Sequence, residues 1–255
     1  MNLADPPTQL ELSLPRLAGR RKPRFAVIQF PGSNCDQDCV RSLRDDCGYD
    51  AEYVWHRESS LDGFDAVVIP GGFSYGDYLR CGAMARHSPV MKSVSEAAES
   101  GVPVIGICNG FQILCEAGLL PGALLRNRSL HFVCGPVTLR VESVDSPFTS
   151  LCHPGQLLTI PVAHGEGCYF ADAGTLKSLE ENDQVLLRYV DAVTGEANDA
   201  ANPNGSEANI AGICNRERNV FGLMPHPDRA SHIRLGSEDG KIIFAAMAER
   251  ALAPV

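Results

Sequence analysis

The stretch Val104-Ile-Gly-Ile-Cys-Asn-Gly-Phe-Gln-Ile-Leu114 joins two apolar segments through a cysteine that is flanked by small residues. Its first four residues are typical of a buried strand, and the segment after Asn109 is typical of a helix. A strand that ends in Gly-x-Cys-x-Gly and leads into a helix has the layout of a nucleophile elbow, a sharp turn that presents one side chain at the carboxyl edge of a sheet. The pattern therefore indicates Cys108 as a candidate nucleophile.

The expected position of Cys108 at a helix N-terminus also favours a thiolate. Aligned peptide dipoles and free N–H groups stabilise negative charge at this end of a helix. A buried structural cysteine that happens to precede a helix fits the same stretch, so these residues alone leave both interpretations open.

Strand-like and helix-like segments alternate over the first 120 residues. Strands are predicted at Phe25–Gln29, Asp50–Trp55, Asp65–Ile69 and Val102–Ile107, and helices at 36–46 and 88–100. This alternation is typical of an α/β fold with an open, mostly parallel sheet covered by helices on both faces.

After residue 130 the pattern changes to shorter strand-like pieces. They are Val137–Val141, Leu158–Val162, Gln184–Val190, Ile210–Cys214 and Val220–Met224. A last amphipathic helix is predicted over 241–252. We expect these pieces to add antiparallel strands to the same sheet in the C-terminal half, without forming a second domain.

Residues 1–24 contain four prolines, five cations and two anions, and they are interpreted as a basic, flexible tail before one domain at 25–255. Removing the tail from the chain's 22 cations and 31 anions leaves a body with a net charge of −12. Such a surface repels phosphate backbones, so nucleic acid is not an expected partner.

No apolar run approaches the roughly 20 residues that span a bilayer, so no membrane partner is expected and the chain is predicted to be cytoplasmic.

The ten cysteines contain no Cys-x-x-Cys pair, which removes the usual zinc and thioredoxin spacings. We therefore expect reduced thiols and no metal site. The acidic residues Asp36, Asp38, Asp45 and Asp46 are interpreted as a solvated face.

His226 is the candidate base among seven histidines. It lies in Met224-Pro-His-Pro-Asp228, where Pro227 pushes His226 into an extended conformation and both prolines oppose a helix. Residues two apart in an extended segment face the same way, so Asp228 is expected beside His226 as its orienting carboxylate. The alternative is an exposed histidine at a turn.

Pro70-Gly-Gly-Phe-Ser-Tyr-Gly-Asp77 follows a buried strand and so belongs at the same edge of the sheet as Cys108. Its glycines allow backbone N–H groups to turn into a site as an oxyanion hole. A phosphate loop has a similar glycine spacing, but Asp77 stands where that motif needs lysine, and a carboxylate would repel phosphate.

Together, Gly106–Gln112, Pro70–Asp77 and Met224–Asp228 resemble the motifs of a class I, or triad-type, glutamine amidotransferase. Four further stretches narrow the resemblance to the glutaminase subunits of phosphoribosylformylglycinamidine synthase, a purine-pathway enzyme: Pro31–Asp36, Tyr78–Gly82, Pro161–Gly167 and Pro225–Pro227. The resemblance covers roughly residues 25–250 in order. It implies a flavodoxin-like, three-layer fold.

The resemblance implies a role for each matching residue. Cys108 would be the nucleophile, His226 the base and Asp228 the carboxylate, although the family usually has Glu at that position. The glutamine-binding residues implied are Gly72 or Phe73, together with Asn109, as backbone N–H donors of the oxyanion hole, and Gln112, His164, Gly165 and Glu166 near the substrate.

The implied reaction is hydrolysis of L-glutamine to glutamate and ammonia through a Cys108 thioester. The ammonia would serve the large synthetase subunit, which converts formylglycinamide ribonucleotide to the amidine, and a small bridging subunit completes the complex. No cofactor is implied in this chain, since ATP and Mg belong to the synthetase. Two alternatives remain: a stand-alone cysteine hydrolase of the same fold, such as a peptidase or γ-glutamyl hydrolase, and a non-catalytic thiol sensor.

Overall fold

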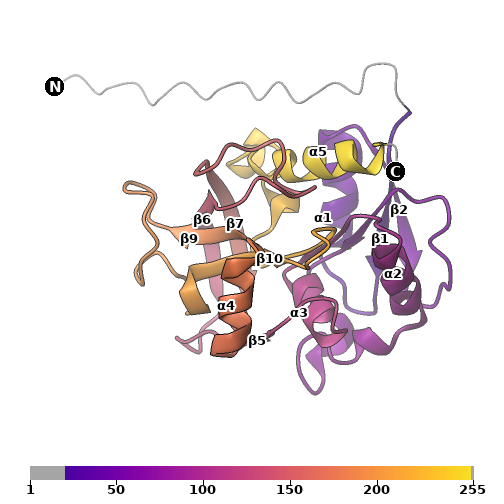
Figure 1. Cartoon of the computed structure of the whole chain (residues 1–255). Coiled ribbons are helices and arrows are strands. Elements are labelled where there is room, and N and C mark those ends of the chain that lie inside the picture. The colour runs from indigo at the N-terminus through magenta and orange to yellow at the C-terminus, as the bar shows by residue number, and fades with distance from the viewer. Residues whose placement is uncertain (1–20, 254–255) are drawn as a thin grey trace.

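A computed structural model describes residues 21–253 (Figure 1). The predicted basic tail therefore lies outside the described residues, apart from 21–24. Within that short part, Arg21 forms an ion pair with Asp65 at 2.6 Å, and Arg24 is the first residue of a strand.

The order of elements matches the predicted alternation. The strands are β1 (Arg24–Gln29), β2 (Asp50–Trp55), β3 (Ala66–Ile69), β4 (Val104–Ile107), β5 (Ala123–Leu125), β6 (Val133–Val141), β7 (Leu157–His164), β8 (Cys168–Phe170), β9 (Val185–Val190), β10 (Ile210–Cys214) and β11 (Val220–Leu223). The α-helices are α1 (Asp36–Arg41), α2 (Pro89–Glu99), α3 (Asn109–Glu116), α4 (Ala173–Glu181) and α5 (Gly240–Ala251).

One large sheet has the strand order β2-β1-β3-β4-β11-β10-β9-β6-β7, and β5 and β8 form a separate pair. The first five strands in this order, β2, β1, β3, β4 and β11, run parallel to one another. The remaining neighbours, β11 and β10, β10 and β9, β9 and β6, and β6 and β7, pair in antiparallel fashion. The predicted α/β fold, a mostly parallel sheet extended by antiparallel strands of the C-terminal half, is confirmed.

The position of β11 differs from the sequence expectation. It pairs in parallel with β4, from Val220 opposite Val104 to Leu223 opposite Ile107, so it belongs to the parallel part of the sheet. Its hydrophobic sequence is compatible with either direction. The parallel direction brings the carboxyl ends of β4 and β11, and hence Cys108 and the residues after Leu223, to the same edge.

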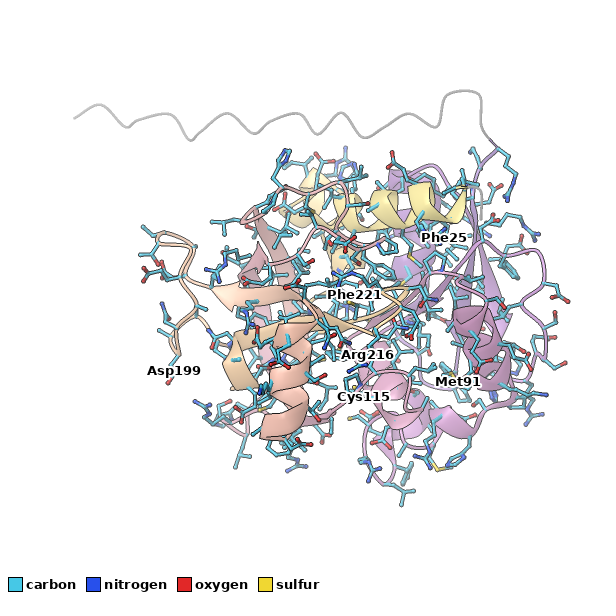
Figure 2. All side chains as sticks on the ribbon, viewed as in Figure 1. Phe25, Met91, Cys115, Asp199, Arg216 and Phe221 are labelled. Carbon is cyan, nitrogen blue, oxygen red and sulfur yellow. The ribbon has the colours of Figure 1, made fainter. Side chains whose placement is uncertain are left out.

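The helices lie on both faces of the sheet. In Figure 1, α5 lies above the sheet and α3 and α4 lie below it. Figure 2 places Phe221 of β11 in the interior between these layers, and its side chain is fully buried. Every residue of β3 and β4 is buried, whereas β2 at the sheet edge is partly exposed, as its sequence predicts, with only Ala51 and Val54 buried.

Two helical segments differ from the prediction. The helix expected over 36–46 is α-helical only to Arg41 and continues as a π-helical turn over Ser42–Asp46. Helix α4 was not anticipated. Its start is marked by Asp172, whose carboxylate accepts a hydrogen bond from the backbone N–H of Thr175 at 2.9 Å, the arrangement of an N-cap.

The interpretation of Asp36, Asp38, Asp45 and Asp46 as a solvated face is wrong for Asp36, whereas Asp38 and Asp46 are partly exposed but have partners in the protein. Asp36 is buried and accepts a hydrogen bond from Gln29 at 2.6 Å. Asp38 pairs with Arg229 at 3.1 Å, and Asp46 accepts from the hydroxyl of Ser231 at 2.6 Å. Asp36 thus joins α1 to β1, and Asp38 and Asp46 join α1 and its π turn to the segment after β11, which a charge pattern alone does not reveal.

Two glycines make the turn at Cys108 possible by allowing close packing. A Cβ atom at Gly106 would lie 2.5 Å from the carbonyl oxygen of Gly110, and a Cβ atom at Gly110 would overlap the carbonyl oxygen of Ile69. Helix α3 therefore rests directly on the backbone of β3 and β4.

We predict that Gly110→Ala lowers the free energy of unfolding by about 3 kcal/mol, because the added methyl group has no space and overpacking costs roughly this much. Urea unfolding followed by circular dichroism measures the change. Gly174→Ala is the matched control, since a Cβ atom there meets no backbone atom and only one side-chain atom, Oδ1 of Asp172 at 3.2 Å. Equal stability of the two variants would contradict the proposed packing constraint.

Candidate active site

Cys108 occupies the turn between β4 and α3 in a strained backbone conformation. Its φ is 52° and its ψ is −106°, a region that residues other than glycine rarely adopt. The backbone N–H of Cys108 donates to the carbonyl of Leu223 at 2.7 Å, which ties the turn to β11. Such strain costs of order 1–3 kcal/mol and persists where the surroundings enforce it. The side chain is buried at the carboxyl edge of the sheet.

His226 and Asp228 lie together just beyond β11. Both are buried, and Nδ1 of His226 is 3.4 Å from Oδ1 of Asp228. His226 is extended, and its backbone N–H donates to the carbonyl of Pro161 at 2.7 Å. Asp228, however, lies in a 3-10 turn over Pro227–Arg229, so the expectation of one continuous extended segment is wrong. The turn still brings the carboxylate to the imidazole.

The surroundings of His226 favour its protonated form. Complete burial by itself lowers the pKa of His226, but the carboxylate of Asp228 and then the sulfur of Cys108 outweigh burial and raise the pKa well above its ordinary value. An imidazolium beside a cysteine is the arrangement that stabilises a thiolate.

Gly71 marks the point where the nucleophile and the base converge. A Cβ atom at this position would lie 2.8 Å from Cε1 of His226 and 3.4 Å from Cβ of Cys108. It would also lie 3.2 Å from Sγ of Cys35. A side chain at Gly71 would therefore push between the base and the nucleophile.

Cys108 and His226 open into one cavity of about 250 Å³. The residues that line it are Asn34, Cys35, Gly72, Phe73, Asp77, Cys81, Cys108, Gln112, Phe132, Ala163, His164, Gly165, Glu166, His226 and Arg229. The cavity thus contains every site residue predicted from the sequence except Asp228, which lies behind His226, and Asn109, which lies under the adjoining loop.

The backbone N–H groups near Cys108 differ in their availability. The N–H of Phe73 donates to the carbonyl of Gly32 at 2.9 Å. Within residues 21–253, the N–H groups of Gly72 and Asn109 have no such acceptor. A Cβ atom at Gly72, whose φ is 136°, would overlap the backbone N of Asn34, so only glycine fits this close approach. Gly72 and Asn109 are therefore the candidate oxyanion donors, and Phe73 contributes its side chain to the cavity.

Asn109 and Gln112 connect the loops around the cavity. Oδ1 of Asn109 accepts from the backbone N–H and the hydroxyl of Ser74, and its amide donates to Oε1 of Gln112 at 2.8 Å. The amide of Gln112 in turn donates to the carbonyl of Glu166 at 2.6 Å. These bonds fix the loop after β3 and the loop after β7 relative to α3.

His164, at the end of β7, is a second buried histidine beside the cavity. Burial and the neighbouring His226 lower the pKa of His164 to about 4, so its imidazole is neutral at neutral pH. In the part of the chain that the structure describes, Nδ1 of His164 has no hydrogen-bond partner.

The comparisons with known proteins agree with this geometry. Residues 22–238 match the family model of the CobB/CobQ-like glutamine amidotransferase domain. The chain is 58% identical over 232 residues to the phosphoribosylformylglycinamidine synthase subunit PurQ of Gloeobacter violaceus, which covers 91% of this chain and 100% of that protein. The chain belongs to the PurQ glutamine amidotransferases.

Two further relatives support the assignment. Subunit PurQ of Salinibacter ruber is 56% identical over 224 residues, which cover 88% of this chain and 95% of that protein. A chain of the PurLQS structure from Thermotoga maritima is 44% identical, with a TM-score of 0.79 and coverage of 90% of this chain and 99% of that chain. The resemblance inferred from the motifs is confirmed.

Sequence reasoning missed several residues of this amidotransferase site. Arg229 and Cys35 line the cavity, and the guanidinium of Arg229 donates to Sγ of Cys35 at 3.1 Å.

Asn127 is fully buried and holds the loop after β7 in place. Its amide donates to the carbonyl of His164 at 2.9 Å, and its side-chain oxygen accepts from the backbone N–H of Gly167 at 3.0 Å. Asparagines in polar loops look like turn residues in a sequence, so only the burial of Asn127 reveals its role.

No helix within residues 21–253 is both long and apolar enough to cross a bilayer. The same residues contain no group of three or more His, Cys, Asp or Glu side chains placed to hold a metal ion. All ten cysteines lie in this range, and none forms a disulfide.

The lowered pKa of His164 predicts a pH-dependent contribution to stability. Its folded-state pKa of about 4 lies below the value of about 6.5 expected in the unfolded chain, so between these two values the unfolded state binds more protons. Stability should therefore fall as pH decreases from about 6.5 to 4, by about 3 kcal/mol at most, as for any histidine that is buried in its neutral form. Urea unfolding at a series of pH values measures this decrease in the free energy of unfolding.

His164→Gln should lack this acid-dependent loss, so its stability difference from the wild type should change with pH. His153→Gln, at an exposed histidine, is the control and should follow the wild type. A constant difference between His164→Gln and the wild type from pH 7 to 4 would contradict the buried neutral state.

Proposed function

We propose that this chain hydrolyses L-glutamine to glutamate and ammonia and supplies the ammonia to a partner synthetase that makes formylglycinamidine ribonucleotide from formylglycinamide ribonucleotide with ATP. The observation that carries the proposal is the convergence of a strained Cys108 and a buried His226 on one cavity, in a chain of the PurQ family.

The first half of the reaction forms a thioester. The thiolate of Cys108 attacks the carbon of the side-chain amide of glutamine, and the electron pair of the C=O bond moves to oxygen. The N–H groups of Gly72 and Asn109 would stabilise this oxyanion, because neither has a backbone acceptor within residues 21–253. As the intermediate collapses, the imidazolium of His226 gives its proton to the departing nitrogen, and ammonia leaves.

The second half releases glutamate. The neutral imidazole of His226 takes a proton from a water molecule as the water oxygen attacks the thioester carbon. The C–S bond breaks, the glutamyl group leaves as glutamate and His226 again faces the Cys108 thiolate as an imidazolium. Asp228 stabilises that imidazolium in both halves of the reaction, consistent with its effect on the pKa of His226.

The acidic end of the cavity suits the α-ammonium group of glutamine. Asp77 and Glu166 both line the cavity, and burial followed by repulsion from Glu166 raises the pKa of Asp77. A cationic ammonium between the two carboxylates would relieve this repulsion. Gly165 and Glu166, held by Gln112, would then position the amino-acid end of the substrate while its amide reaches Cys108.

Exposed apolar side chains beside the cavity support a protein partner. Phe73 and Phe132 line the cavity and are 49% and 55% exposed, and Tyr78, Leu79 and Leu130 in the same loops are 76%, 88% and 75% exposed. Large exposed apolar side chains that gather at one place mark interaction sites. The relative in the PurLQS structure supports PurL- and PurS-type partners here, namely the large synthetase subunit and the small bridging subunit.

This chain needs no cofactor in the proposed reaction, because thiolate attack and proton transfer require only its own side chains. ATP and Mg would bind to the synthetase subunit. We propose a cytoplasmic location, since released ammonia has to reach its partner directly and the partner requires ATP.

The stand-alone hydrolase and the thiol sensor are not favoured. PurQ relatives match this chain over nearly their whole length. A sensor would also have no need of the buried His226 and Asp228 pair behind the thiol.

We predict that Cys108→Ala abolishes glutamine hydrolysis, with a loss of at least about 10³-fold, because no other group can carry the glutamyl intermediate. With the synthetase subunits present, the variant should still form the amidine when ammonium chloride replaces glutamine. A coupled glutamate assay and product chromatography measure the two activities.

Cys35→Ala is the matched control, because Cys35 lines the same cavity without occupying the turn. It should keep glutaminase activity within about tenfold. Glutaminase activity that survives Cys108→Ala would remove Cys108 as the nucleophile, and failure of the synthetase to use ammonia or glutamine would favour a stand-alone hydrolase.

We predict that Asp228→Asn lowers kcat for glutamine hydrolysis by roughly tenfold or more, because an amide neither stabilises the His226 imidazolium nor holds its tautomer. Steady-state kinetics with the synthetase present measure the change. Asp38→Asn is a control, since that carboxylate pairs with Arg229 and does not reach His226. Turnover of Asp228→Asn close to that of the wild type would remove Asp228 from the triad.

A further inference from the structure

Asn204 brings a long surface loop back to the active site. The loop connects β9 to β10, and Figure 2 shows Asp199 at its outer end, away from the body of the molecule. Asn204 itself is only 1% exposed. It is the point at which this loop contacts His164 at the cavity.

Ser206 fixes the orientation of the Asn204 amide. The backbone N–H of Ser206 donates to Oδ1 of Asn204 at 3.1 Å, and the hydroxyl of Ser206 donates to the same oxygen at 2.7 Å. A backbone N–H can only donate, so the atom that it contacts must be the oxygen. The amide nitrogen therefore faces the other way, 3.0 Å from Nε2 of His164 and 3.3 Å from Oη of Tyr189.

This orientation determines the tautomer of His164. The Asn204 amide nitrogen carries two hydrogens and has no lone pair to accept with, so Nε2 of His164 must be the acceptor. In a neutral imidazole, the hydrogen is then on Nδ1. Protonation of both nitrogens would break the bond to Asn204, which agrees with the neutral state expected for this buried ring.

The Nδ1 side of His164 is buried and is the side of the ring that the described residues leave without a hydrogen-bond partner. A Cβ atom at Gly167 would overlap Cδ2 and Nε2 of His164, so the opposite edge of the ring is packed closely against this glycine and Asn204. His164 lines the cavity, and its Nδ1 has no partner within residues 21–253. A buried N–H without an acceptor is destabilising, and an oxygen of a ligand would satisfy it.

We propose that Asn204 is a positioning residue for glutamine: it holds His164 in the Nδ1–H tautomer, so that His164 donates an uncharged hydrogen bond to an oxygen of the substrate. The role in hydrolysis rests on the proposed glutaminase function. An imidazolium at His164 would lie beside His226 and oppose the protonation of that base. A neutral His164 can donate a hydrogen bond to the substrate without this repulsion.

The test compares Asn204→Asp with the wild type in the full-length chain. The carboxylate can still accept from Ser206, but it cannot donate to Nε2 of His164, and it accepts a hydrogen there instead. The variant should therefore move the His164 hydrogen to Nε2 or protonate both nitrogens. Two-bond ¹H–¹⁵N correlation spectra of protein labelled with ¹⁵N-histidine report the tautomer at pH 7, and His164→Gln identifies the signals.

Kinetics with the synthetase present provide the second measurement. We expect Asn204→Asp to raise KM for glutamine at least tenfold with a smaller change in kcat. Asn209→Ala is the matched control: Asn209 donates to the carbonyls of Tyr189 and Asn198 in the same loop and does not reach His164. It should keep the wild-type tautomer and a KM within about twofold.

Three results would overturn the proposal: a hydrogen on Nε2 of His164 in the wild type, an unchanged tautomer in Asn204→Asp, or a changed tautomer with unchanged KM and kcat. The first does not depend on Asn204→Asp, so it decides the matter even if that variant does not fold. Wild-type protein that shows the Nδ1–H tautomer but never hydrolyses glutamine would instead overturn the glutaminase function, and the positioning role with it.

Discussion

The close approach of α3 to the backbone of β3 and β4 is the constraint on which the active site depends. Gly110 lies directly against the carbonyl of Ile69, and Gly106 lies against Gly110. With no side chains between them, the helix begins immediately after the strand, and Cys108 must take a positive φ to make the turn. The strain in Cys108 is therefore a consequence of packing that is stabilised elsewhere, by the buried strands and the bond from Cys108 N–H to Leu223.

The parallel insertion of β11 beside β4 completes the site. It places His226 at the same sheet edge as Cys108, and the 3-10 turn that follows brings Asp228 to the imidazole. A buried charged pair recovers its desolvation cost only when each charge has a partner. Here the partners are Asp228 on one side of His226 and Cys108 on the other, which explains why the pKa of a fully buried histidine is raised.

The sequence predicts the parts of this structure that depend on local pattern. Apolar runs identify β3 and β4, because buried strands need apolar side chains. The glycines around Cys108 identify the turn, because a sharp turn needs residues without a side chain. The direction of β11 was not predictable, since a short apolar strand carries no information on its neighbour. Asn127 and Asn204 were missed for a related reason: both lie in polar loops, where a buried clamp and an exposed turn residue have the same local sequence.

Unpaired polar atoms are concentrated at the site. Among residues 21–253, the buried side-chain atoms without a hydrogen-bond partner belong to Ser42, His164, His226 and Asp228; His164 and His226 line the cavity, and Asp228 lies behind His226. Folding normally pairs such atoms, so their survival in one place indicates that the protein tolerates a local cost there. A substrate oxygen that accepts from His164 would satisfy part of this demand, and the same interaction would help to align the amide carbon of the substrate with the sulfur of Cys108.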